Sequence, residues 1–272
     1  MSALFADTTF NSGTTFNSDI SGWFVGNVTN MDRMFYYATN FNQPLDNWAM
    51  GNVIDMSQMF HGTKSFNQPL ASWNTSRVQD MSYLFEKATN FNQDLSSWNT
   101  SNVVTMAGMF LSCSAFNQPL ASWDVSRVGT LKAMFWGAKS FNQPLASWDV
   151  SRVGTLENTF TNSAFNSPID SWNTSSLTIL ANTFQYNEVF NQPLNSWDTS
   201  KVFAMGHAFL GASAFNQPLD NWSTGNVLYM QVMFDLAVAF NQPIDNWDVS
   251  RVETMVYVPA SERCGDGVAQ QS

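Results

Sequence analysis

Apolar and polar residues follow the same order in every stretch of about 25 residues along this chain. Each unit opens on a Phe-Asn pair and carries a tryptophan seven residues later, from Phe16 and Trp23 to Phe240 and Trp247. Ten units follow one another, and eight of the nine intervals between the Phe-Asn pairs are 25 residues long, while one is 24. A fixed period of this size predicts a repeat solenoid of about ten stacked coils.

The apolar spacing inside a unit predicts two kinds of local structure. The segment from Leu120 to Val128 reads Leu-x-x-Trp-x-Val-x-x-Val, which is the leucine-rich-repeat spacing. We expect a short strand over Trp-x-Val that pairs in parallel with its copy in the next coil. Further on, Met106, Met109, Phe110 and Cys113 recur at three or four residues, which predicts a short helix or 3-10 turn. The expected fold class is therefore a leucine-rich-repeat-like solenoid with these two elements in each coil.

The Phe-Asn-Gln-Pro string should close each coil, because proline fixes φ and removes a backbone donor. The one-residue deletion, between Phe160 and Phe165, is expected in this turn. The asparagine occurs in every unit, so we expect it to point inward and to hydrogen-bond the turn backbone of neighbouring coils. This predicted ladder comprises Asn17, Asn42, Asn67, Asn92, Asn117, Asn142, Asn166, Asn191, Asn216 and Asn241.

Two rows of residues beside the inward tryptophan should face solvent, and binding would take place there. The ninth residue of each unit gives one row and the twelfth gives the other, while the tenth residue is expected to point inward. Every aspartate of the ninth-position row shares its unit with a base of the twelfth-position row, which we interpret as local charge compensation worth about 0–1 kcal/mol per pair. The predicted binding face comprises Asn74, Arg77, Asn99, Asn102, Asp124, Arg127, Asp149, Arg152, Asn173, Asp198, Lys201, Asp248 and Arg251.

The charge balance limits the classes of partner. With 11 basic and 21 acidic residues and a net charge of -10, the chain offers no concentrated basic patch for nucleic acid or an anionic membrane. No stretch approaches the roughly 20 apolar residues of a membrane span, so we expect no direct membrane insertion. Met1 to Phe10 lacks the features of a secretion signal. Cys113 stands where most units carry alanine, which predicts a small buried residue rather than a disulfide partner or metal ligand.

The sequence contains no arrangement typical of a catalytic or cofactor site. His61 and His207 fall at different places in their units, and we interpret both as isolated surface side chains. Glycine motifs for phosphate binding and dense acidic clusters for calcium are absent. We therefore expect no enzyme activity, no cofactor and no metal. Five N-x-S/T sequons are candidate N-glycosylation sites, although repetition alone also explains them: Asn27, Asn74, Asn99, Asn173 and Asn221.

Three segments are expected along the chain. A partial N-terminal repeat would occupy residues 1–15, the ten-coil solenoid residues 16–258, and a tail or linker residues 259–272. Pro259 stands where the last unit needs its second phenylalanine, and proline blocks continuation of a helix there.

The repeat FNQPLxSWDVSRVxxMxxMFxxA, seen in Phe141 to Ala164 with variations late in the unit, resembles that of the BspA-like leucine-rich-repeat surface proteins. It is especially similar to the branch catalogued as a mycoplasma surface lipoprotein repeat. The resemblance covers about Phe16 to Met255. It implies an extracellular or cell-surface repeat domain without catalytic residues, for which adhesion or partner binding has been proposed in some members.

These observations favour a non-enzymatic binding or adhesion module that presents polar ladders to a protein or glycan partner. One alternative is a structural spacer or an accessory subunit of a larger assembly. A minor alternative is ice binding by repeated threonines, but those at the tenth position are predicted to point inward: Thr75, Thr100, Thr174, Thr199 and Thr224.

Overall fold

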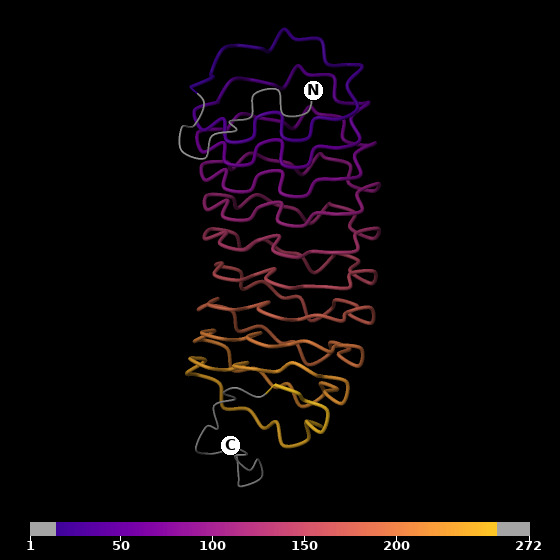
Figure 1. Ribbon diagram of the computed structural model, residues 1–272, viewed down its shortest axis with the longest axis vertical. Coiled ribbons are helices and arrows are strands. Elements are labelled where there is room, and N and C mark those ends of the chain that lie inside the picture. Colours follow the sequence, from indigo (N-terminus) through magenta and orange to yellow (C-terminus); the bar gives the residue numbers. More distant parts are fainter. Residues whose placement is uncertain (1–14, 255–272) are drawn as a thin grey trace.

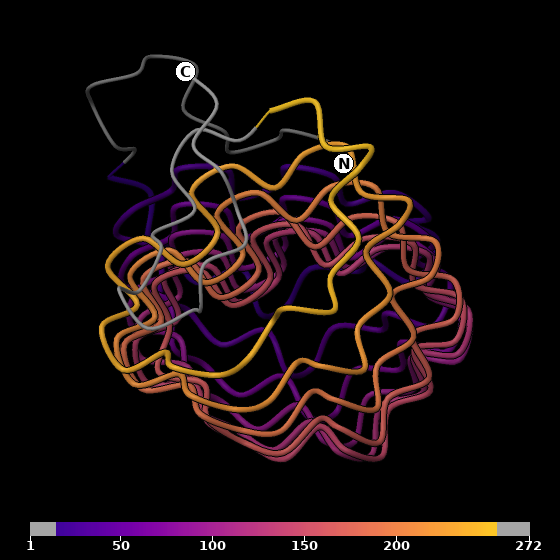
Figure 2. The ribbon, with the colours of Figure 1, turned by 90° about the horizontal axis from the view of Figure 1, so that it is seen from below.

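The computed structural model describes residues 15–254, and these residues form one stack of coils along the long axis of the molecule (Figure 1). Seen along that axis, successive coils trace nearly the same closed outline (Figure 2). We number the coils from the Phe-Asn pairs, so that coil 5 begins at Phe116 and coil 6 at Phe141. The predicted tail, residues 259–272, and all but the last residue of the predicted N-terminal segment, residues 1–15, lie outside the described residues, and both stay predictions.

Each coil consists of tight turns joined by short extended segments. Backbone hydrogen bonds close turns from the fifth to the eighth position and from the tenth to the thirteenth, as in Trp123 N–H to Leu120 O (3.1 Å) and Val128 N–H to Val125 O (2.9 Å). Further turns overlap where the second element was expected. Residues 15–254 contain no helix and no continuous strand, so the prediction of a short helix or 3-10 turn in each coil is wrong.

Left-handed residues explain why the helical spacing does not produce a helix. In coil 5, Ala133 has a φ of 57° and Gly137 a φ of 70°, and these two positions are left-handed in each of the first nine coils. A left-handed residue every fourth position ends any right-handed helix. It also turns alternate N–H groups toward the next coil, so that Phe135 N–H donates to Thr159 O (2.9 Å) and Gly137 N–H donates to Thr161 O (2.8 Å). The spacing of three and four residues thus marks the inward side of successive turns.

The parallel pairing between coils lies at a different place from the one predicted. It involves the fifteenth position, seven residues after the tryptophan, and each contact is an isolated parallel bridge such as Thr130 with Thr155. The residues that form these bridges are Asn30, Asp55, Asp80, Thr105, Thr130, Thr155, Ile179, Ala204, Tyr229 and Thr254. Backbone hydrogen bonds between coils are made mainly by the residues at positions fourteen to twenty-two of each coil. One example, at the fourteenth position, is Gly154 N–H to Gly129 O (3.0 Å). The Trp-x-Val segment is therefore not the paired strand.

Side chains connect the coils over the other half of the circuit, where the asparagine ladder is confirmed. Each asparagine Oδ1 accepts the backbone N–H of the next asparagine along the stack, at 2.8 to 3.0 Å from Asn17 to Asn241. The following glutamine strengthens the ladder, since Gln118 Nε2 donates to Asn92 Oδ1 at 3.0 Å. The asparagine side chains are half-buried or exposed rather than inward, because the turn they bond lies at the surface.

Three further side-chain ladders were not predicted from the sequence. The tryptophan Nε1–H donates to the carbonyl of the fifth residue of the preceding coil, as in Trp148 to Leu120 O at 2.9 Å. The serine before it donates in the same direction, as in Ser147 Oγ to Ala121 O at 2.8 Å. The tenth-position threonines are buried, as predicted, and four of them donate to the next coil: Thr75, Thr100, Thr174 and Thr199. These hydrogen bonds satisfy backbone carbonyls that the missing strand would otherwise pair.

Columns of aromatic rings fill the interior. The second phenylalanine of each coil stacks on the first phenylalanine of the next coil, with ring centroids 3.9 Å apart for Phe110 and Phe116, and each stacks on its copies above and below. Trp98 and Trp123 are parallel to within 1° with centroids 6.4 Å apart. Offset stacking at such distances adds to the stabilisation from burial. Cys113 lies in this core, fully buried, which confirms its interpretation as a small interior residue.

The one-residue deletion falls at the closing turn of coil 6, as predicted. Other coils close there with a backbone bond such as Phe141 N–H to Ala138 O, whereas Phe165 N–H points at the Ser163 hydroxyl (3.4 Å). In the next coil the buried Asn187 donates to Phe165 O (2.9 Å) and accepts from Phe190 N–H (3.1 Å). Buried polar side chains thus replace backbone partners that the shorter turn cannot supply.

Candidate functional site

The most regular exposed feature of the described coils is the pair of rows at the ninth and twelfth positions, which we call the polar face. Every ninth-position residue is exposed, and the twelfth-position residues are exposed or half-buried. The ninth position comes directly before the turn that spans the tenth to thirteenth positions, and the twelfth position lies within that turn. The structure therefore places the whole predicted binding face on one side of the stack.

The ninth-position residues also stabilise this turn. Asp124 Oδ1 accepts the N–H of Ser126 at 3.0 Å, and Asn99 Oδ1 accepts the N–H of Ser101 at the same distance. The same bond is made by Asn74, Asp149, Asn173, Asp198 and Asp248. Hydrogen bonds from the serine two residues on, through side chain and backbone, hold the pKa of the aspartates below its usual range: Asp124, Asp149, Asp198 and Asp248. One carboxylate oxygen of each aspartate accepts the hydrogen bond of the turn, and the negative charge stays at the surface.

The twelfth-position bases bind the preceding coil rather than their own. Arg127 Nη1 donates to Asn102 Oδ1 at 2.8 Å, and that asparagine in turn donates to Ser76 O. The pairs Arg77 with Asn52 and Arg251 with Asn226 repeat this arrangement. Lys201 Nζ donates to Ser175 O at 2.7 Å. These bases thus form yet another ladder between coils.

The predicted acid–base compensation within a coil takes place without contact. Among the described residues, ion pairs join other side chains: Arg33–Asp32, His61–Glu86, Lys87–Glu86 and Lys132–Glu157. The charge of Arg152 does lower the pKa of Asp149, after the larger effect of the Ser151 hydrogen bonds. The charges of the two rows therefore influence each other, but no ion pair joins them in residues 15–254, because the aspartates cap turns and every base except Arg152 binds the preceding coil.

Arg152 interrupts this arrangement. The residue before it in the row is Arg127, so no asparagine is placed to accept its guanidinium. Within residues 15–254, Arg152 has no hydrogen-bond or ion-pair partner. Asp124 and Asp149 are also consecutive in their row, and the charge of Asp149 raises the pKa of Asp124 slightly against the serine hydrogen bonds. Coils 5 and 6 thus place two aspartates next to each other in one row and two arginines next to each other in the other row.

The predicted glycosylation sites are all exposed, and three share one conformation. Asn74, Asn99 and Asn173 lie in the ninth-position row with Oδ1 bound to the turn. Asn27 belongs to the twelfth-position row and Asn221 to the turn before the tryptophan.

The interpretation of His61 as a surface residue is wrong. Its side chain is buried at the corner of coils 1 to 3, with Nδ1 2.9 Å from Glu86 Oε2. The Tyr36 and Tyr37 rings pack against the imidazole with centroids 4.6 and 4.8 Å away, and neither ring nitrogen has an aligned hydrogen-bond partner. Burial would raise the pKa of Glu86, but His61 and Lys87 lower it on balance. Tyr36, His61 and Glu86 occupy the same position of consecutive coils, so comparison of the units was the signal that could have found this cluster.

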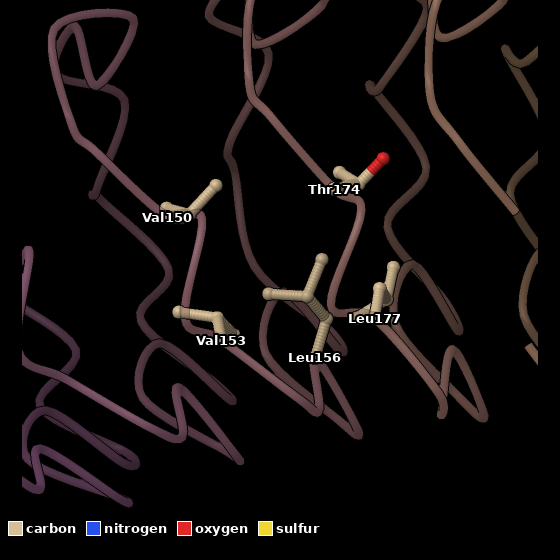
Figure 3. Close-up of a pocket in the computed structure, with 5 residues that line it drawn as sticks. All are labelled: Val150, Val153, Leu156, Thr174 and Leu177. Atoms are coloured by element: carbon tan, nitrogen blue, oxygen red, sulfur yellow. The ribbon is translucent and has the colours of Figure 1, made fainter. Parts of the chain in front are cut away.

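The interior offers little room for a ligand at the hollow between coils 6 and 7. Val150, Val153 and Leu156 of coil 6 line it together with Thr174 and Leu177 of coil 7, and it does not admit a water molecule (Figure 3). No group of three or more His, Cys, Asp or Glu side chains suited to a metal ion occurs in residues 15–254. Over the same range, no helix has the length and apolar character needed to cross a membrane.

These features define a solenoid repeat protein whose coils are joined by backbone bridges on one side and by asparagine, glutamine and other side-chain ladders on the other. The chain belongs to the family described as "Mycoplasma protein of unknown function, DUF285", whose model matches residues 3–76, 63–167 and 154–263 in tandem. No curated protein is similar enough to the chain to count as a match.

Proposed function

We propose that this protein is a non-enzymatic binding module that uses the polar face to hold a protein or glycan partner. The observation that carries the proposal is the guanidinium of Arg152, which has no hydrogen-bond or ion-pair partner in residues 15–254 and lies near the exposed carboxylate of Asp149. A guanidinium with no hydrogen-bond or ion-pair partner among the described residues can form charge-assisted hydrogen bonds to a ligand, and the coil beneath it is held by backbone hydrogen bonds to its neighbours.

The tandem repeats support the same interpretation at a coarser level. A chain built from tandem repeats creates an extended surface with one similar site per coil, which suits recognition of a long or repetitive partner. Membership of the BspA-like leucine-rich-repeat branch, an adhesive role and an extracellular or cell-surface location are parts of this proposal.

A binding comparison between two folded proteins tests it. The variant carries Asp124→Asn, Arg127→Gln, Asp149→Asn and Arg152→Gln, because asparagine keeps the turn cap, as Asn99 shows, while the charges are removed. Both proteins are applied to glycan arrays and used to capture partners from a cell surface and its medium. We expect the variant to lose binding that the unchanged protein shows.

The matched control removes two acids and two bases elsewhere on the coils, through Asp46→Asn, Lys64→Gln, Lys139→Gln and Asp245→Asn, all of which are exposed. This control should bind as well as the unchanged protein. Equal binding by all three proteins, or none by any, would contradict the proposal and favour a structural spacer that acts through other surfaces.

A further inference from the structure

No salt bridge accounts for the match between acid and base within a coil, although the charges of Arg152, Lys201 and Arg251 each lower the pKa of the aspartate in their own coil. All four ninth-position aspartates share their coil with a twelfth-position base, yet none of these pairs forms a salt bridge in residues 15–254. The bases reach back to the preceding coil, and the aspartates cap turns, a task that asparagine performs equally well in Asn74, Asn99 and Asn173. Direct salt bridges to these aspartates therefore remain available to a partner outside the single chain.

We propose that the partner of the polar face is a second copy of this chain, packed face to face with the two stacks parallel and in register. A two-fold axis parallel to the stack leaves every coil opposite its own copy and exchanges the two rows across the interface. Asp124 then faces Arg127 of the second copy, and Asp149 faces Arg152 of the second copy. An isologous interface requires this kind of self-complementary patch.

Other two-fold arrangements do not satisfy the pattern. At full overlap, an axis across the stack would place each row against itself in reverse order, so that Asp124 would meet Asp149 and Arg127 would meet Arg152. Like charges in apposition across an interface are strongly unfavourable. Only the parallel arrangement converts the coil-by-coil match into opposite charges in contact, and it also sets Asn99 against Asn102 of the second copy, where both sides can donate and accept.

The charge of the whole molecule selects this face for self-association. The net charge of -10 makes most encounters between copies repulsive. The polar face is the exception, because it carries five bases and four aspartates while the rest of the chain is acidic. In the proposed dimer, Arg152 faces the carboxylate of Asp149 of the second copy. Within the described residues, Arg152 has no hydrogen-bond or ion-pair partner.

The size of the face fits a modest, reversible dimer. Ten coils at a spacing of about 4.8 Å, and a strip about five residues wide, give roughly 700 Å² per copy. Specific interfaces bury about 800 Å² per partner, so the face lies near the lower end of this class. Its polar composition predicts that the dimer weakens as salt is raised.

Two complementary variants test the inference. The acidic variant carries Arg127→Glu and Arg152→Glu, and the basic variant carries Asp124→Arg and Asp149→Arg. The ninth position tolerates residues without the cap, as Ala49 and Ser223 show. Sedimentation equilibrium should show the unchanged protein as a dimer, while each variant alone should have its Kd raised at least about tenfold. An equimolar mixture of the two variants should restore the dimer.

A register control uses a second basic variant, Asp198→Arg with Asp248→Arg, mixed with the acidic variant of coils 5 and 6. In-register packing predicts that this mixture stays monomeric, since the altered coils do not face each other. Circular dichroism and urea unfolding confirm that all variants are folded.

A monomeric unchanged protein would overturn the inference, as would a dimer that both variants form equally well or that the mismatched mixture restores. The inference rests on the proposed function, because it names the partner of the same face. The two fail separately, since a monomer that still captures a glycan or another protein through the polar face leaves the proposed function in place.

Discussion

The contact between Tyr83 and Gly108 allows a quantitative test of how neighbouring coils fit. Both residues occupy the eighteenth position, in coils 3 and 4, with φ values of 56° and 60°. A Cβ added at Gly108 would lie 2.2 Å from Tyr83 Cδ1. Every left-handed tyrosine among residues 15–254 is followed by a glycine in the next coil, and the other two pairs are Tyr37 with Gly62 and Tyr186 with Gly211. We infer that these glycines are needed for space beneath the ring.

The expected loss of unfolding free energy in the Gly108→Ala variant has two contributions. Alanine is able to adopt the conformation, because Ala133 does so at the same position of the next coil with a φ of 57°. A left-handed alanine costs about 1–2 kcal/mol. Displacing the tyrosine ring adds about 1–3 kcal/mol as overpacking. The free energy of unfolding should therefore fall by about 2–5 kcal/mol, and by only about 1–2 kcal/mol in a Tyr83→Ala background, where the ring is gone.

Urea unfolding of the four proteins in this double-mutant cycle, followed by tryptophan fluorescence, gives the coupling free energy. Gly129→Ala is the control, since no atom lies within 4 Å of the added Cβ and its φ is not left-handed. That substitution should be neutral or stabilise by about 0.4–1 kcal/mol. If Gly108→Ala and Tyr83→Ala are additive to within about 0.5 kcal/mol, the reasoning about space beneath the ring is refuted.

Three further outcomes are expected. Trp148→Phe should lower the free energy of unfolding by about 1–2 kcal/mol, because the buried Nε1–H bond to Leu120 O is lost, whereas Trp136→Phe, at a side chain 40% exposed, should change it by less than about 0.5 kcal/mol in the same urea assay. The serine hydrogen bonds that lower the pKa of Asp149 stabilise the fold fully above the ordinary aspartate pKa of about 3.9. That contribution should disappear as the pH falls below this value through the lowered pKa, and Asp149→Asn, which keeps the cap, should remove its share of the pH dependence measured by thermal unfolding. Burial raises the pKa of Cys113, so in a Cys264→Ser variant at pH 8 a disulfide reagent should react with the thiol only after urea unfolds the protein, and rapid reaction of the folded protein would contradict this.

The sequence predicted well whatever depends on recurrence. The tandem coils, the asparagine ladder, the inward tenth position, the buried Cys113 and the location of the one-residue deletion all follow from comparing units, and the structure confirms each of them. The polar face was also predicted correctly as exposed. The hydrogen bonds of its bases were not predicted, since a base such as Arg127 binds Asn102 one coil back.

The sequence by itself thus determined the period, the number of coils and which residues face inward, since these depend on repetition and on the burial of apolar side chains. The tertiary structure decided the backbone. A helix and a series of turns with a left-handed residue at every fourth position both produce an apolar spacing of three and four residues. Only the stacking of coils favours the turns, because the turns direct N–H groups such as that of Phe135 to carbonyls of the next coil. Stacking likewise brings His61 to Glu86 and leaves Arg152 without a hydrogen-bond or ion-pair partner in residues 15–254, since both results depend on residues a whole coil away.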